Sequence, residues 1–185
     1  PDWVQASTTH TRDGASLECY PRASLVHYHF PKGEKHGAID LHWYDGGLKP
    51  TIPDGLPENF ELGGNGAFIV GDKGVIFHSS HGAGGAVLLP ESRRAQYTDP
   101  KPYLPRVDQS DNAHEADWIR ACKDGRPASS NFEYGGPLTE MVLIGVLAIR
   151  MKDQRLKWDG ENLEITNNKA ANALVNPPLR KGWSL

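Results

Sequence analysis

The chain has 185 residues, of which 38% are hydrophobic and 23% are charged, and its formal net charge is −3 at pH 7. This composition excludes an intrinsically disordered chain, and the length is sufficient for one domain with a buried core. The small negative charge gives no electrostatic reason to bind nucleic acid or an anionic membrane surface. We therefore expect a single globular domain whose partners include neither.

Short strands dominate the expected secondary structure. Residues 24–30 and 38–44 each alternate apolar and polar side chains, which is typical of strands with one buried face. In the second run Leu41 and Trp43 share one face, whereas His42 and Tyr44 share the other. The short break between the runs predicts an antiparallel pair. Further strands are expected at residues 3–10, 67–70, 75–79, 86–89, 155–158 and 163–166.

Glycine and proline residues mark the connections between these strands. The segment 71–74, Gly-Asp-Lys-Gly, predicts a tight hairpin, and residues 11–16 predict a turn. Three prolines in the segment 46–64 and three more in 97–107 predict two irregular connections.

Helices are expected only late in the chain. Residues 112–123 have an acceptor at the start and Glu115 three residues on, which predicts a capping box, and Cys122 is expected to be a small buried side chain. Residues 137–151 start with proline and are apolar on every face, which predicts a buried central helix. The apolar run 141–149 is too short to span a bilayer. A short helix is expected at 169–175, and the fold class is α+β: an open, mostly antiparallel sheet with helices packed on one face.

The glycine-rich stretches do not predict a dinucleotide site. Such a site needs a strand, a G-x-G-x-x-G turn and a helix whose N-terminus faces the pyrophosphate. Ile69 and Val87 occupy the third glycine position of the two nearest matches, and both stretches lead into predicted strands. Hairpin turns and flexible loops explain these glycines, so we expect no cofactor-binding residue in this chain.

Histidines gather on the predicted polar faces of two strands. His27, His29 and His42 fall on the same side as Asp40, and imidazoles on paired strands are able to hold zinc. A polar sheet face that is solvated or pairs with another subunit explains the same pattern. We favour this second interpretation and predict no metal site.

Aromatic residues beside acids suggest a sugar site. Trp43, Tyr44 and Asp45 end a predicted strand, where rings can stack on a sugar and a carboxylate can bind its hydroxyls. An aromatic core plug followed by a turn explains them equally well. His114 and Trp118 share one side of a helix, and His114 is either a half-buried structural residue or a contact at the edge of a cleft.

Seven segments stand out by their order along the chain. They are residues 41–47 with Pro50, 70–74, 89–91, 131–134 followed by 137–140, 156–159, 165–167 and 180–183. Their order and spacing resemble those of the C-terminal domain of the bacterial branch of Gfo/Idh/MocA oxidoreductases, and the resemblance covers nearly the whole chain.

The resemblance implies a two-domain enzyme. Its N-terminal Rossmann domain would bind NAD or NADP, and residues 1–185 would form the C-terminal domain that shapes the pocket for a sugar or polyol and forms a homo-oligomer through the open sheet face. The usual reaction transfers a hydride between a carbinol carbon and the nicotinamide. The catalytic lysine and the helix with the acid/base residues belong to a region before Pro1, so this chain alone is expected to be inactive. The remaining pocket candidates are Trp43, Tyr44, Asp45, His114 and Tyr134.

Two other functions stay open at this point. Related proteins are NAD-dependent glycosidases, which oxidise a sugar carbon transiently in order to eliminate the aglycone. A stand-alone carbohydrate-binding or oligomerisation module would bind sugar without any nucleotide. Exported relatives often carry a twin-arginine signal ahead of the segment seen here, so the compartment stays open too.

Overall fold

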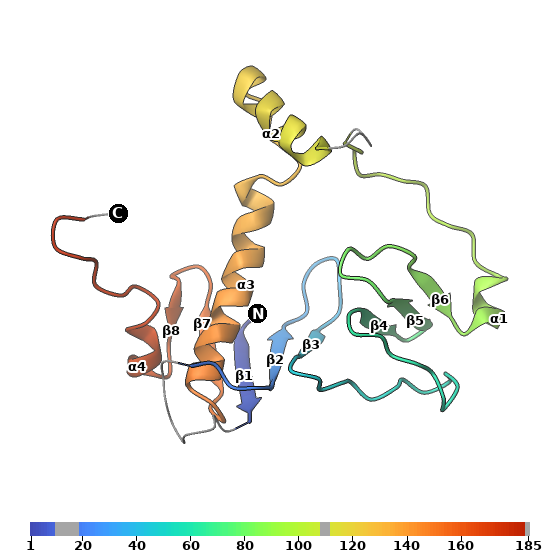
Figure 1. Cartoon of the computed structure of the whole chain (residues 1–185), viewed down its shortest axis with the longest axis horizontal. Helices are drawn as coiled ribbons and strands as arrows, with labels where there is room; N and C mark the ends of the chain where they lie inside the picture. The colour runs from blue at the N-terminus through green and yellow to red at the C-terminus, as the bar shows by residue number, and fades with distance from the viewer. Residues whose placement is uncertain (10–18, 108–111, 184–185) are drawn as a thin grey trace. The chain divides into compact units, whose positions relative to one another are not determined.

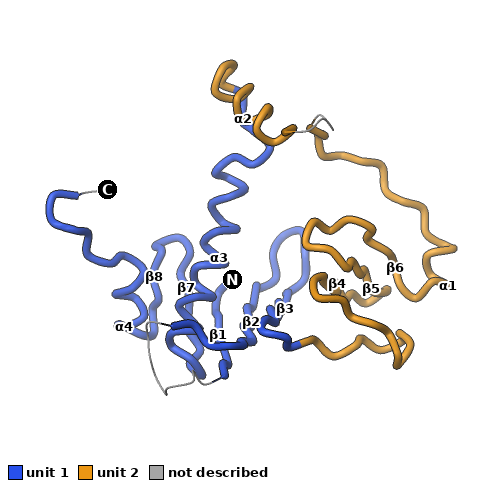
Figure 2. The backbone as a smooth tube through the Cα atoms, viewed as in Figure 1, with its two compact units in different colours: residues 1–48, 126–185 blue, residues 49–125 orange. Residues whose placement is uncertain are grey.

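The computed structural model describes residues 1–9, 19–107 and 112–183, coloured along the chain in Figure 1. The chain forms two compact units, which Figure 2 distinguishes by colour. Unit 1 comprises Pro1–Leu48 and Arg126–Leu185, and unit 2 comprises Lys49–Gly125. Each unit is built around its own antiparallel sheet.

Unit 1 contains a five-stranded sheet in the order β3-β2-β1-β7-β8, with every neighbouring pair antiparallel. The alternation in residues 24–30 places Val26 and Tyr28 on the face that is buried in the core. The strands are β1 (Trp3–Thr8), β2 (Ser24–Phe30), β3 (Ile39–Tyr44), β7 (Leu156–Asp159) and β8 (Glu164–Ile165).

Helix α3 (Phe132–Arg150) covers one face of this sheet and packs on β1 and β2. Gly145 makes the close approach possible, because a Cβ at this position would collide with the hydroxyl of Tyr28. The indole of Trp158 on β7 donates a 2.6 Å hydrogen bond to Oε1 of Glu140 on α3. The short helix α4 (Lys169–Asn172) adds Ala171 to the same core.

Length and composition would also allow α3 to cross a membrane, which is weak evidence because core helices meet the same criterion. The helix extends nine residues before the apolar run at 141–149, since it begins at Phe132. Its contacts with β1 and β2 fit a helix that covers a sheet. The expected lack of a membrane span stays a prediction.

Unit 2 contains a three-stranded antiparallel sheet in the order β4-β5-β6. Its strands are β4 (Ala67–Gly71), β5 (Gly74–His78) and β6 (Val87–Leu89), and its helices are α1 (Glu91–Arg94) and α2 (Ala113–Asp124). Phe60, Phe68 and Phe77 pack together, with ring centroids 5.0–5.9 Å apart. None of the residues of α2 is buried, and all of them are described.

The predicted α+β class and the open antiparallel sheet are confirmed. The expected hairpin at 71–74 is present, with Gly71 paired to Gly74, and so is the antiparallel pair of β2 and β3. The strands form two sheets instead of one, because the long connection after β3 leads to a hairpin with its own aromatic cluster. The turn expected at 11–16 lies outside the described residues.

Several helix predictions were wrong in detail. Helix α3 begins five residues before Pro137, because the side chain of Asn131 caps it by accepting from the backbone N–H groups of Glu133 and Tyr134. This helix is not buried on every face: Leu138, Val142 and Leu143 are exposed. The capping box expected at the start of α2 does not form, since Asn112 makes no side-chain cap there, and Cys122 is exposed rather than buried.

Candidate functional site

The face of the five-stranded sheet opposite α3 carries a group of polar and aromatic side chains that contact one another. We call it the open face. It comprises Trp3 and Gln5 on β1, His27 and His29 on β2, Asp40, His42 and Tyr44 on β3, and Arg155 and Lys157 at β7. These side chains are half-buried or exposed, and on β1, β2 and β7 their positions alternate with buried ones.

Strand register orders these side chains into rows. Asp40 pairs with His29, His29 pairs with Trp3, and Trp3 pairs with Lys157. A second row places His42 opposite His27, which in turn pairs with Gln5. Side chains directly opposite each other on antiparallel strands are close enough to interact, so each row is a line of contacts across the sheet.

Asp40 joins two of the imidazoles. Nδ1 of His29 lies 2.8 Å and Nε2 of His27 lies 3.3 Å from the same oxygen, Oδ1 of Asp40. Because an ionised carboxylate only accepts, both imidazoles donate to it, which fixes their orientation and their tautomers. These hydrogen bonds, that of His29 first, hold the pKa of the Asp40 carboxyl below its usual range, so Asp40 is charged.

Aromatic contacts continue the cluster on both sides. Trp3 stacks nearly parallel to His29 with ring centroids 5.5 Å apart, and it meets His27 edge-on with centroids 4.8 Å apart. The guanidinium carbon of Arg155 lies 3.9 Å from the ring centroid of Trp3, a cation–π geometry.

The rings of β3 continue the cluster on the other side. The ring centroid of His42 lies 4.1 Å from that of His27, and the ring centroid of Tyr44 lies 6.4 Å from that of His42.

The crowding of imidazoles changes the acidity of His42. Burial lowers the pKa of His42 below its ordinary value, the nearby His27 lowers it further, and the charge of Asp40 acts in the opposite direction. The neutral form of His42 is therefore favoured at neutral pH. Within the described ranges, no group of three or more His, Cys, Asp or Glu side chains is arranged to hold a metal ion.

The sugar-site candidates at the end of β3 do not act together. Trp43 pairs with Val26 and Tyr44 pairs with Leu25, so the two rings lie on opposite faces of the sheet and do not enclose one ligand. Trp43 is 60% exposed, which leaves its ring available for stacking.

Asp45 has a structural role that the sequence left open. Its carboxylate accepts from the backbone N–H of Ser24 at 2.6 Å and from the hydroxyl of Ser24 at 2.7 Å. The following residue, Gly46, has φ +64°, and a Cβ there would collide with the backbone of Arg22 and Ala23. Asp45 and Gly46 therefore fix the end of β3 against the start of β2.

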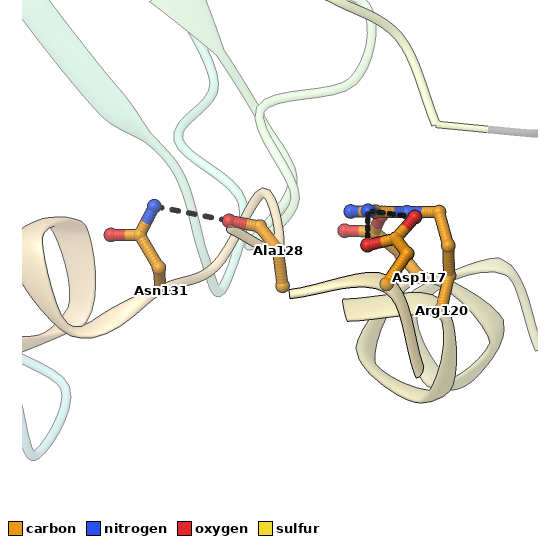
Figure 3. Close-up of polar contacts among 5 residues, drawn as sticks. Asp117, Arg120, Ala128 and Asn131 are labelled. Carbon is orange, nitrogen blue, oxygen red and sulfur yellow. Dashed lines mark hydrogen bonds and ion pairs between the residues drawn. The ribbon is translucent and has the colours of Figure 1, made fainter. Parts of the chain in front are cut away.

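His114 and Tyr134 lie in different units and are both exposed. His114 is on α2 in unit 2. On the same helix Arg120 forms an ion pair with Asp117 at 2.8 Å (Figure 3) and another with Asp124 at 3.0 Å.

Tyr134 is in the first turn of α3 in unit 1 and is 65% exposed. Figure 3 also shows Asn131, which caps this turn, donating to the carbonyl of Ala128 at 3.1 Å.

The described residues do not fit a nicotinamide dinucleotide. The glycines at 63–66 lead into β4, and those at 82–85 lead into β6, so neither group opens a helix. Among the described residues, strands lead into helices from β6 to α1 and from β8 to α4, and both helices have only four residues. The first junction contains Pro90 and begins α1 with Glu91, an acid where a phosphate would need donors.

Comparison with known proteins does not identify the site, so its interpretation depends on its geometry alone. No protein-family model matches the chain, and no curated protein matches it. The resemblance described from the sequence motifs therefore remains a hypothesis.

Sequence reasoning found the histidines, Asp40 and Tyr44 but missed the four members of the open face on β1 and at β7: Trp3, Gln5, Arg155 and Lys157. Trp3 and Arg155 are 152 positions apart in the numbering, and β1 and β7 bring them together. The alternation of β1 was a usable signal for the direction of Trp3. The pairing of β1 with β7 had no local signal, because it joins opposite ends of the chain.

Proposed function

We propose that this chain is the substrate-side and oligomerisation domain of an NAD(P)-dependent oxidoreductase that acts on a sugar or polyol. In this proposal the nucleotide is bound by a separate Rossmann domain, and the present chain contributes the opposite wall of the cleft. The open face of the five-stranded sheet forms the contact with another copy.

The architecture of unit 1 is the observation that carries the proposal. The sheet is covered by α3 on one face only, and its other face presents aromatic rings and imidazoles that are half-buried or exposed. An open sheet with helices on one side, which associates through the free face, is what the family resemblance implies for its C-terminal domain. Rings and histidines are also suited to an interface between proteins, because they bury large surfaces while keeping a polar atom.

The positions of the motifs give further support. The segment 41–47 ends β3 and forms the turn after it, the segment 70–74 is the β4–β5 hairpin, and Asn131 caps α3. Proteins with the same backbone need the same strand ends, turns and caps. The segments that resemble the family form features of this kind.

Trp43 is the best substrate contact of the candidate residues. Its ring is exposed at the end of β3, where CH–π stacking on a sugar ring requires an open aromatic face. Asp45 is less suited, since its carboxylate already binds Ser24 through both oxygens.

Titration of the chain into NADH, followed by nicotinamide fluorescence, tests whether this chain leaves the binding of the nucleotide to a separate domain. We expect no saturable binding, and saturable binding at micromolar concentration would overturn the proposal. The coding sequence upstream of Pro1 provides a second test, because it should specify a strand, a glycine-rich turn and a helix. An upstream sequence without them would contradict the proposal.

Calorimetry with a panel of sugars separates the remaining functions. Tight sugar binding by this chain alone, lost in Trp43→Ala and independent of nucleotide, would replace the proposal with a stand-alone carbohydrate-binding module. Release of an aglycone by the longer protein only when NAD is added would replace the redox outcome with glycosidase chemistry.

A further inference from the structure

We propose that the open face is a self-complementary surface whose pairing with a second copy is released when its imidazoles take up protons. This inference rests on the proposed oligomerisation role and adds the arrangement of the two copies and its regulation. It follows from the order of charges across the sheet and from the number of imidazoles that share one carboxylate.

The first row of the open face runs from an acid to a base. Asp40 on β3 and Lys157 on β7 lie at its two ends, with His29 and Trp3 between them. The middle of the row falls between β2 and β1, so the acid and the base are equally far from it in strand order.

Consider a two-fold axis that is parallel to the strands and passes over this midpoint. A rotation about it maps the row of one copy onto the row of the second copy in reverse order. Such an axis places β3 of one copy over β7 of the other, so that Asp40 faces Lys157 of the second copy and the reverse contact forms as well. The same rotation places Trp3 over His29 of the second copy, which pairs an aromatic ring with an imidazole. A symmetric interface requires this kind of self-complementarity, and most homo-oligomers have it. A row with one sign of charge at both ends would repel itself, so the charge order argues for a second copy as the occupant.

Proton uptake would oppose this contact. His27, His29 and His42 lie on the open face, and Asp40 is the carboxylate that binds two of them. One carboxylate offsets one imidazolium, which leaves two uncompensated charges on each copy when all three imidazoles are protonated.

The other charged groups of this face lie at its β7–β8 end and have both signs. Arg155 and Lys157 on the β7 side are cations, whereas Gln5 and Trp3 on β1 carry no charge. Asp159, which is held by Asn162, and its strand partner Glu164 are acids, two and three strands away from β2. These two acids offset the two cations, so the charge of the imidazoles stays uncompensated. Covering an imidazolium also removes its water, so association favours the neutral form and releases protons.

Linkage gives the direction of the effect. For each proton released on pairing, the dissociation constant of the dimer rises about tenfold for every pH unit by which the pH falls below the ordinary imidazole pKa of about 6.5. Sedimentation equilibrium of the full chain should therefore show a dimer at about pH 8 and a dissociation constant at least about tenfold larger at about pH 5.5. Circular dichroism at both pH values checks that the chain stays folded.

Charge exchange tests the arrangement of the two copies at about pH 8. Asp40→Lys and Lys157→Asp should each weaken the dimer, and the double variant should restore it, because Lys at position 40 then faces Asp at position 157 of the other copy. Glu58→Lys and Lys101→Asp make the same charge changes at exposed positions of unit 2 and serve as controls. A double variant that is as weak as the sum of the single ones overturns the two-fold arrangement.

Removal of titratable groups tests the switch. The variant His27→Gln/His42→Gln should keep the dimer at about pH 5.5 and flatten the pH dependence, since only His29 remains beside Asp40. If the unmodified chain is a monomer at about pH 8, the oligomerisation role fails together with this inference. If it is a dimer with the same dissociation constant at both pH values, the oligomerisation role stands and the switch is refuted.

Discussion

The two faces of the five-stranded sheet come from the same strands but have different chemistry. Tyr28 is buried under α3, whereas its neighbour His29 binds Asp40 on the open face. The buried residues of the covered face are fixed by packing, because they form one core cluster with residues of α3. Residues on the open face are fixed by one another, through a shared carboxylate and stacked rings. The covered face should therefore determine stability, and the open face should determine association.

The largest expected effect is a cavity under the covered face. Leu156 is 1% exposed, so Leu156→Ala should lower the free energy of unfolding by about 2–5 kcal/mol. Leu138→Ala removes the same atoms from a side chain of α3 that is 49% exposed, and it should have a much smaller effect. Urea denaturation measures both, and equal losses would break the distinction between covered and exposed positions.

The close approach of α3 to the sheet gives the next effect. Gly145→Ala should cost about 1–3 kcal/mol, because the new methyl group meets the hydroxyl of Tyr28. Gly136→Ala in the same helix has open space around the new methyl group and should be neutral or stabilising by up to about 1 kcal/mol. Tyr28→Phe in the Gly145→Ala background should recover part of the loss in thermal unfolding; no recovery would show that the hydroxyl is not the obstacle.

Substitution of Asp45, which follows β3, tests whether its carboxylate stabilises the fold. Asp45→Ala leaves the buried hydroxyl and N–H of Ser24 without their acceptors, so we expect a loss of about 1–3 kcal/mol. Asp45→Asn keeps one acceptor oxygen and should lose less. An unchanged unfolding midpoint in Asp45→Ala would argue that the carboxylate is available to a ligand.

The smallest effect on stability is expected on the open face. His42→Gln changes an exposed side chain, so the free energy of unfolding of the monomer should stay within about 0.5 kcal/mol. Chemical denaturation at a concentration too low for association checks this value. A loss as large as that of Gly145→Ala would show that the open face also holds the fold together.

Local signals predicted β2 and β3 well because both strands alternate apolar and polar side chains. The run from Ser24 to Phe30 was found with both ends correct, and the direction of His27, His29 and His42 followed from it. The start of α3 was missed because Pro137 is a strong local signal for a helix start, whereas the cap comes from Asn131 and lies outside that signal. The exposure of Cys122 could not be read from its apolar neighbours, since it depends on whether another element covers α2.

The amino-acid sequence by itself determined the strand faces, the hairpin at 71–74 and the α+β class, because these depend on side-chain alternation and turn residues that are close together in the chain. Only the tertiary structure decided which face of the large sheet is covered and which residues meet on the other face. The pairing of β1 with β7 brings Arg155 over Trp3, and no short-range pattern specifies it. Contacts of this kind join distant segments, and their cost in chain entropy is offset by the whole core rather than by any local preference.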